Sequence, residues 1–326
     1  MIEVGAAASR GTNARLTTRP RRRNRSPFGP RHGIAAPAYA WVWFLPWMLP
    51  FLIFAVGAAL AIFVYSLTDL NGLPGVPTHW IGLHNYREFF GAAQFAGSRA
   101  VLIRTVIFCL AVTVVQNSLA LALAVILNGR IRGSRIWRAL IFMPTILGVA
   151  VIGLMWSLIL DPNNGPVAGL LRPLGVHTAL LGDSNIAFEL VIAIMIWGCV
   201  GYAMVIYLGG LQAIPGELHE AAVVDGASRW RTFRHVTFPL LSTALTANVL
   251  LSLIGSLQAY QYIYVLTSGK FDTSVLATEV VQFGFFNEST NEGYAAALSI
   301  VQFLLILVVV ALVYVPLRLR ERRLVN

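Results

Sequence analysis

The sequence predicts an all-α membrane protein with six transmembrane helices and both termini in the cytoplasm. Three observations lead to this prediction: 57% of the 326 residues are hydrophobic, only 12% are charged, and long apolar runs recur along the chain. Soluble domains average about 25% charged residues, so the composition excludes an ordinary soluble fold.

Each apolar run is long enough to cross a bilayer, because about 20 helical residues span the ~30 Å hydrocarbon core. The predicted spans are residues 41–68, 101–127, 136–160, 187–212, 237–266 and 295–317. Residues 1–38 are rich in Arg, Gly, Pro and Ala and predict a disordered cytoplasmic tail, which leaves 39–326 as the transmembrane domain. Pro144 removes one backbone hydrogen bond from the third span, and the sequence leaves open whether the helix kinks there.

The positive charges predict the orientation of the spans. With the N-terminus inside, 19 of the 24 Lys and Arg residues lie on the cytoplasmic side and 5 lie outside, as the positive-inside rule requires. The net charge of +10 therefore reflects membrane insertion, and no basic face interleaved with aromatic residues suggests nucleic acid. We expect the lipid bilayer as a partner and no nucleic acid.

The outer segment after the first span predicts a short helix on the membrane surface. Asn85 in 79-HWIGLHNYREFF-90 is its expected N-cap. The aromatic residues of this segment suit the headgroup level of a membrane.

The sequence offers no catalytic or metal-binding constellation. Cys109 and Cys199 each fall inside an apolar run, where thiols usually pack, and the six histidines show no metal-ligand spacing. The single lysine, Lys270, is not part of a phosphate-binding loop. We therefore expect no catalytic residue and no metal, and an energy source in a partner or an ion gradient.

A compact charged segment, 220-EAAVVDGASRWRTF-233, separates the fourth and fifth spans. Pro215 ends the preceding helix, and a short helix can begin near Glu217, where the helix dipole favours acids. Asp225-Gly226 then reverses the chain, because glycine accepts a positive φ. Ser228 can cap a second helix. The segment is predicted to form a helix pair that projects from the membrane.

This segment resembles the signature loop of ABC-importer permeases, the inner-membrane components of binding-protein-dependent transport. Glu220, Ala221 and Ala222, followed by Asp225, Gly226 and Ala227, stand at the family's spacing. The stretches 81-IGLHNYREFF-90 and 137–165 resemble the carbohydrate-uptake subfamily. The match is nearest to the first permease of maltose- or glycerol-phosphate-type systems.

The resemblance implies a transport mechanism. The loop at about 214–236 would be a coupling helix that docks on a separate ATPase, with Glu220 pairing a basic residue and Gly226 keeping the turn. Two cytoplasmic ATPase subunits would bind ATP and Mg, so this chain would hold no cofactor. A homologous second permease would form the other half of the passage, and an extracytoplasmic binding protein would deliver a sugar or sugar-like solute. The chain would be a multi-pass protein of the bacterial inner (plasma) membrane.

Polar residues of the fifth span are the candidates for the substrate pathway, because sugars require hydrogen-bonding groups beside an aromatic ring. These candidates are Asn248, Ser252, Gln258 and Tyr262. Either cavity lining or helix packing explains them, and cavity lining is favoured for Asn248. Gln116-Asn117 and Gln302 are interpreted as interhelical hydrogen bonds.

Two other classes of function stay open. An ion-coupled secondary transporter is the alternative, although it would usually carry an intramembrane carboxylate and internal repeats. A receptor or scaffold could use the charged segment for binding alone. Disaccharide, oligosaccharide and glycerol phosphodiester all remain open as solutes.

Overall fold

The computed structural model describes residues 40–73, 75–91, 95–129, 132–174, 179–286 and 291–325. The chain divides into two units, Met1–Ala55 and Val56–Asn326. The described part of the first unit is helical: α1 (Ala40–Phe51) contains Pro46 and Pro50 and leads into a π-helical turn, η1 (Leu52–Gly57). The predicted tail, residues 1–38, lies outside the described residues.

The described part of the second unit is built from helices, with one isolated bridge between Thr68 and Trp80. The longer helices are α2 (Ala58–Tyr65), α4 (Phe95–Asn128), α5 (Ser134–Ile146), α6 (Val149–Ile159), α8 (Ala187–Gln212), α9 (Gly216–Val224), α12 (Ser242–Leu257), α13 (Tyr260–Thr267) and α15 (Glu292–Val325). The shorter ones are α3 (His84–Phe90), α7 (Pro166–Leu171), η2 (Arg172–Leu174), η3 (Leu180–Gly182), α10 (Arg229–Thr232), η4 (Phe233–Thr237), α11 (Phe238–Leu240), α14 (Leu276–Val281) and η5 (Gln282–Phe286). The prediction of an all-α protein is confirmed for these residues.

Four helical stretches in the described residues are long and apolar enough to cross a membrane. They are Phe44–Tyr65, Gly97–Asn128, Ala187–Gln212 and Glu292–Leu319. Two further pairs of helices reach this length only when each pair is taken together, so the number of spans lies between four and six.

Both of these pairs are sharply bent. The axes of α5 and α6 turn by 98° at Leu147–Gly148, where the backbone is extended, three residues after Pro144. The segment Arg229–Leu240 meets α12 at 68°. The span predicted over 136–160 is therefore a broken helix, and the bend that the sequence left open is present: it lies at Leu147–Gly148, just after Pro144.

The span predicted over 237–266 is interrupted as well. The helix α12 ends at Leu257, and α13 begins only at Tyr260, after Gln258 and Ala259 have left the α-helical conformation. Asn248 and Tyr262 therefore lie on different helices, and a single helical periodicity does not relate them.

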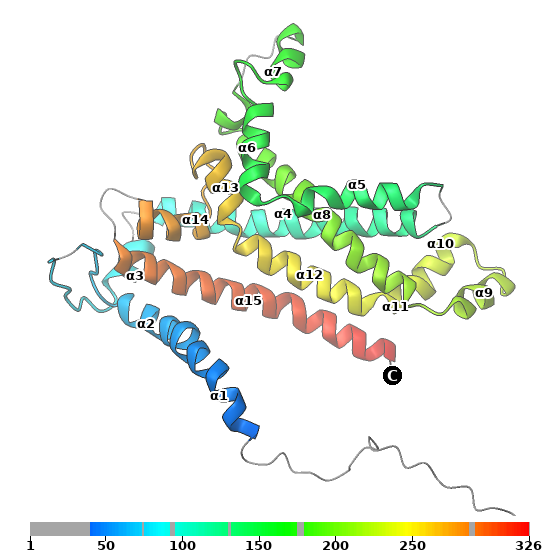
Figure 1. Cartoon of the computed structure of the whole chain (residues 1–326), viewed down its shortest axis with the longest axis horizontal. Helices are drawn as coiled ribbons and strands as arrows, with labels where there is room; N and C mark the ends of the chain where they lie inside the picture. Colours follow the sequence, from blue (N-terminus) through cyan, green and yellow to red (C-terminus); the bar gives the residue numbers. More distant parts are fainter. Residues whose placement is uncertain are drawn as a thin grey trace, which may run out of the picture. The chain divides into compact units, whose positions relative to one another are not determined.

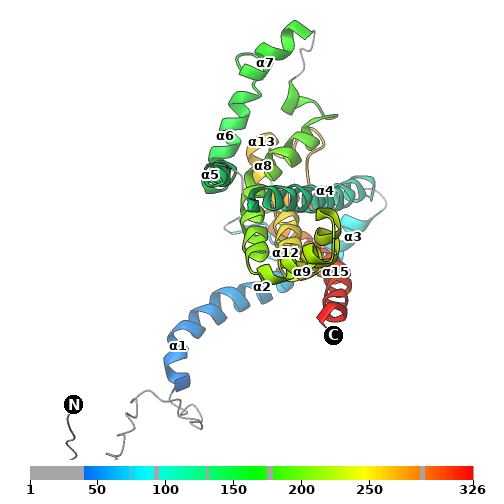
Figure 2. The same cartoon turned by 90° about the vertical axis from the view of Figure 1, so that its right-hand side faces the viewer.

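The core of the second unit is organised around α8. This helix packs along α4 and also contacts α5 and α12, while α12 contacts α4 and α15 (Figure 1, Figure 2). Small buried residues allow the close approach, including Ala120 and Ala124 on α4 and Ala203 on α8. Small side chains at contacts are typical of helices that pack in membranes, where dispersion forces hold helices together.

The structure gives Asn85 a different role from the predicted N-cap of α3. This residue lies inside α3, behind its N-cap Leu83, and is 2% exposed. Its Nδ2 donates to the carbonyl oxygens of Ser66 at 2.9 Å and Thr68 at 3.0 Å. Asn85 therefore caps the end of the preceding helix, because the unpaired carbonyls of a helix C-terminus need donors.

Candidate functional site

The charged segment forms the helix pair that the sequence predicts. The helix α9 begins after Pro215 and has Glu217 in its first turn, and Glu220 lies one turn further along. Its end is a Schellman motif: the Gly226 amide donates to Val223 at 3.0 Å, and the Ala227 amide donates to Ala222 at 2.9 Å. Gly226 has φ +70°, a conformation that glycine adopts without steric cost.

The second arm of the pair is capped and stacked. Ser228 is the N-cap of α10, and its hydroxyl accepts a hydrogen bond from the Arg231 amide at 3.4 Å. The rings of Trp230 and Phe233 stack with centroids 5.7 Å apart. The arms are joined by a hydrogen bond between His219 Nε2 and Thr237 Oγ1, 3.3 Å long. We call residues 216–237 the helix pair.

The helix pair presents apolar and acidic side chains together on its surface. Val224 is 86% exposed, and Val223 and Trp230 are 70% and 68% exposed. Glu220 and Asp225 are also exposed, and neither forms an ion pair with another described residue. Such a mixed surface is typical of a protein docking site, where a few large apolar side chains are surrounded by charges.

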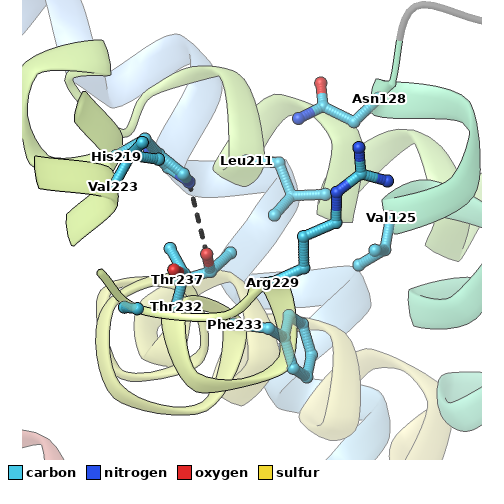
Figure 3. Close-up of a pocket in the computed structure, with 10 residues that line it drawn as sticks. Val125, Asn128, Leu211, His219, Val223, Arg229, Thr232, Phe233 and Thr237 are labelled. Carbon is cyan, nitrogen blue, oxygen red and sulfur yellow. Dashed lines mark hydrogen bonds between the residues drawn. The ribbon is translucent and has the colours of Figure 1, made fainter.

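Beneath the helix pair lies a cavity of about 300 Å³ (Figure 3). Its walls come from the ends of α4 and α8 and from both arms of the pair. Figure 3 shows the Arg229 guanidinium directed toward the end of α4, near Asn128, with His219 on the opposite side. Five of its ten described lining residues are polar and five are apolar, so a cavity of mixed polarity separates the helix pair from the helices behind it.

Two of the four pathway candidates lie in a buried hydrogen-bond network. Ser252 accepts a 2.6 Å hydrogen bond from Nδ2 of Asn117, whose Oδ1 accepts one of 2.7 Å from the Tyr207 hydroxyl. Asn248 is 2% exposed, and its Nδ2 donates to the Ala203 carbonyl at 2.8 Å. These side chains tie α4, α8 and α12 together, so in this structure Asn248 and Ser252 contribute to packing.

The interpretation as interhelical hydrogen bonds is confirmed for Asn117 and Gln302. Asn117 joins α4 to α8 and α12 through the network above. Gln302 Nε2 on α15 donates to the carbonyl of Leu257 at 3.1 Å. Sequence reasoning missed Tyr207, although a tyrosine in an apolar helix is a signal, because a buried hydroxyl needs a partner.

The other two pathway candidates, Gln258 and Tyr262, line a separate cavity of about 760 Å³. This cavity lies where α12 gives way to α13, and it reaches α14 and α15. Its remaining described lining is Val149, Met195, Cys199, Gly255, Ala259, Tyr260, Gln261, Ala277, Val280, Val281, Ser299, Gln302, Phe303 and Ile306. The lining is therefore uncharged, with amide, hydroxyl and aromatic groups.

The described residues contain no group of three or more His, Cys, Asp or Glu side chains that could hold a metal ion. Cys109 and Cys199 are free thiols.

The fold and the helix pair define a class of protein: a helical membrane protein with broken spans and an exposed helix pair between two of them. The chain belongs to the family of binding-protein-dependent transport system inner membrane components, whose model matches residues 116–322. It is accordingly a multi-pass permease subunit of the cell membrane.

Similarity to individual proteins extends over most of the chain. A "Probable ABC transporter permease protein" of Pyrococcus horikoshii is 34% identical over 284 residues, covering 82% of this chain and 94% of that protein. The trehalose/maltose transport system permease protein MalF of Thermococcus litoralis is 31% identical and covers 81% of this chain and 88% of its own length.

A solved structure shares the fold. A chain of a bacterial ABC transporter involved in the import of the acidic polysaccharide alginate superposes with a TM-score of 0.74 at 20% identity, over 88% of this chain and 96% of that one. At this identity the likeness concerns the fold.

Proposed function

We propose that this chain forms half of the translocation pathway of an ATP-driven importer for a sugar or sugar-like solute. A homologous second permease forms the other half, two cytoplasmic ATPase subunits bind ATP and Mg, and an extracytoplasmic binding protein delivers the solute. The helix pair is the docking element for the ATPase. The observation that carries this proposal is the geometry of the helix pair. Both arms are fixed by backbone capping, and their surface exposes apolar and acidic side chains.

In the proposed topology the chain has six spans and both termini in the cytoplasm. Each bent pair of helices then counts as one span, the maximum that the described residues allow. The distribution of charge supports this arrangement, because 19 of 24 Lys and Arg residues lie on the proposed inner side. The helix pair, with Arg229, Arg231 and Arg234, is then cytoplasmic. Residues 1–38 form a cytoplasmic tail of the transmembrane domain.

Docking depends on Glu220, Ala221, Ala222, Asp225, Gly226 and Ala227. The exposed Glu220 carboxylate is available to a basic residue of the ATPase. The Schellman motif fixes the angle between the arms, because its two backbone hydrogen bonds run from Gly226 and Ala227 back into α9. A nucleotide-driven movement of the ATPase would then displace the pair as one body.

The solute pathway runs along the cavity lined by Gln258 and Tyr262. Glutamine amides donate and accept hydrogen bonds, and tyrosine adds an aromatic face, which together suit the hydroxyls and the apolar face of a sugar ring. The uncharged described lining favours a neutral solute. Asn248 and Ser252 lie on the packed side of α12 in the conformation described, and they support this pathway without lining the cavity. The trehalose/maltose system named above supports a carbohydrate as the solute class.

Transport by the reconstituted complex tests the proposal. The permease is co-purified with its second permease and ATPase, and uptake and ATP hydrolysis are measured in proteoliposomes. We expect Glu220→Lys to reduce uptake about tenfold or more, because it places a positive charge against a basic partner. The matched control is Glu217→Lys, an exposed acid on the same helix outside the motif. Gly226→Pro should uncouple hydrolysis from uptake.

Two results would contradict the proposal. The first is uptake at the wild-type rate by Glu220→Lys. The second is gradient-driven uptake by this chain alone, which would instead support an ion-coupled transporter. The topology is tested separately with Val224→Cys, since this position is 86% exposed. Labelling of that cysteine by an impermeant reagent from outside intact cells would overturn the cytoplasmic placement.

A further inference from the structure

Two adjoining cavities of different polarity lie beside the helix pair. One is the cavity of about 300 Å³ beneath the pair; five of its ten described lining residues are polar, and the part of it that they line is called the polar space. The other is a groove of about 580 Å³ between α4 and the second arm. Val125, Arg229 and Phe233 line both of them, so the two spaces meet at Arg229. We propose that together they bind one anionic phospholipid, with its headgroup in the polar space and an acyl chain in the groove.

The polar space suits a phosphate-bearing headgroup. Arg229 supplies a guanidinium, which binds phosphate through paired hydrogen bonds. Asn128 supplies a neutral amide, and His219 stands across the space (Figure 3). The residues that line this space in the described chain include no carboxylate, so an anion meets no like charge there. Arg229 also forms no ion pair with another described residue.

The groove suits an acyl chain. Six of its eight described lining residues are aliphatic or aromatic, and the two polar ones are Ser118 and Arg229. Five exposed or half-exposed positions of α4 form one wall, and the Trp230–Phe233 stack forms the other. The apolar lining residues are Leu121, Ala122, Val125, Ile126, Trp230 and Phe233. Burial of the methylene groups of an acyl chain in a groove with this lining lowers the free energy of binding.

The surrounding segment has the character of an interfacial helix. Residues Arg229–Leu240 turn by 68° away from α12, so this segment does not continue along the span axis. It combines exposed Arg231 and Arg234 with exposed Trp230 and Leu240. Basic residues interleaved with aromatic residues bind the surface of membranes that contain anionic lipids. The assignment to the cytoplasmic leaflet rests on the topology proposed above; the lipid site itself does not.

Native mass spectrometry of the purified full-length chain tests the site without any ATPase or transport. The probes are phosphatidylglycerol and phosphatidylcholine with the same acyl chains. We expect phosphatidylglycerol to bind about fivefold more tightly and Arg229→Gln to remove this preference, since one arginine near a membrane is worth about 1 kcal/mol. Arg234→Gln is the matched control, because Arg234 is exposed on the same segment and lines neither cavity.

A second pair of variants tests the groove. Ala122→Phe fills it and should weaken phosphatidylglycerol binding about tenfold, because several methylene groups lose their site. Val114→Phe is the control, since Val114 is 60% exposed on α4 and lies outside the groove. Retention of phosphatidylglycerol by Ala122→Phe at wild-type affinity would overturn the acyl-chain placement.

The remaining outcomes decide between occupants. Displacement of phosphatidylglycerol by excess inorganic phosphate would overturn the lipid site in favour of a free-anion site. A photoreactive side chain placed at Ala122 in the assembled complex should form an adduct with phospholipid. An adduct with the second permease or the ATPase would instead identify the groove as a protein interface and overturn the proposal. Equal affinity of the wild-type chain for phosphatidylglycerol and phosphatidylcholine would also overturn the proposal.

Discussion

Substitution of Gly201 by alanine tests how tightly α8 crosses α5. A Cβ added at Gly201 would overlap the carbonyl oxygen of Ile141 and lie 2.8 Å from the Cα of Phe142. Both are backbone atoms of α5, so no side-chain rotation relieves the contact. Ordinary van der Waals contact begins at 3.4 Å, so the contact with the Phe142 Cα alone requires the helices to separate by about 0.6 Å, and the shorter contact with the Ile141 oxygen requires more.

The expected magnitude follows from packing. Overpacking of a close contact costs about 1 to 3 kcal/mol. Separation of the helices would also stretch the hydrogen bond that Thr145 Oγ1 donates to the Gly198 carbonyl, now 3.0 Å long. We therefore expect Gly201→Ala to lower the free energy of unfolding by about 1 to 3 kcal/mol. Reversible unfolding in mixed micelles, followed by circular dichroism over a denaturant titration, measures this value.

The matched control is Gly209→Ala on the same helix. A Cβ at Gly209 would meet no atom within 4 Å, so the substitution keeps only the helix-forming advantage of alanine, at most about 1 kcal/mol. The two variants should therefore shift stability in opposite directions. If Gly201→Ala proved as stable as Gly209→Ala, the described crossing of α5 and α8 would be refuted.

Two further substitutions test the buried polar contacts. Asn117→Leu removes the hydrogen bonds to Tyr207 and Ser252 and should lower the free energy of unfolding by about 1 to 2 kcal/mol. Interhelical hydrogen bonds in membranes average about 0.6 kcal/mol each, and the loss of these bonds also leaves their partners unpaired. The same unfolding assay measures the change, and an unchanged stability would contradict the network. Arg138→Met removes the 2.7 Å hydrogen bond to the Leu127 carbonyl at the end of α4 and should cost about 0.5 to 1 kcal/mol, visible as faster amide hydrogen exchange in the last turn of α4. Exchange at the wild-type rate would show that this carbonyl has another donor.

The helix pair could be predicted from the sequence because its signals are local. Pro215, Gly226 and Ser228 each fix one backbone feature within a few residues: a helix start, a positive φ and an N-cap. Such features depend on steric and hydrogen-bonding rules that hold in any context. The structure accordingly has the predicted helix, turn and second helix at those positions.

The pathway candidates could not be sorted from the sequence, because their roles depend on contacts between distant segments. Asn248 and Gln258 are both polar residues of one apolar run, yet the first meets the Ala203 carbonyl and the second lines a cavity. The difference arises because α12 ends at Leu257. Helical periodicity continued past that point places Tyr262 on the wrong face, and no glycine or proline stands between Leu257 and Tyr262 to signal the break.

Asn85 illustrates the same limit at short range. Its position in the sequence fits an N-cap, and the residue does act as a cap, but for α2 rather than α3. Both helices offer unsatisfied backbone groups, and the sequence shows only that a capping side chain is present. Which end it serves is decided by the path of the intervening loop.

The buried network gives the helix pair a mechanical connection to the rest of the permease. The hydrogen bond from His219 to Thr237 joins α9 to the segment that precedes α12. The helix α12 is in turn tied to α4 through Ser252 and to α8 through Asn248. Packed interiors transmit displacement rather than absorb it, so a displacement of the helix pair would be passed on to several helices together. In this view the polar residues of α12 at membrane depth would transmit force, whereas Gln258 and Tyr262, the proposed solute contacts, lie beyond the end of that helix and line the separate cavity.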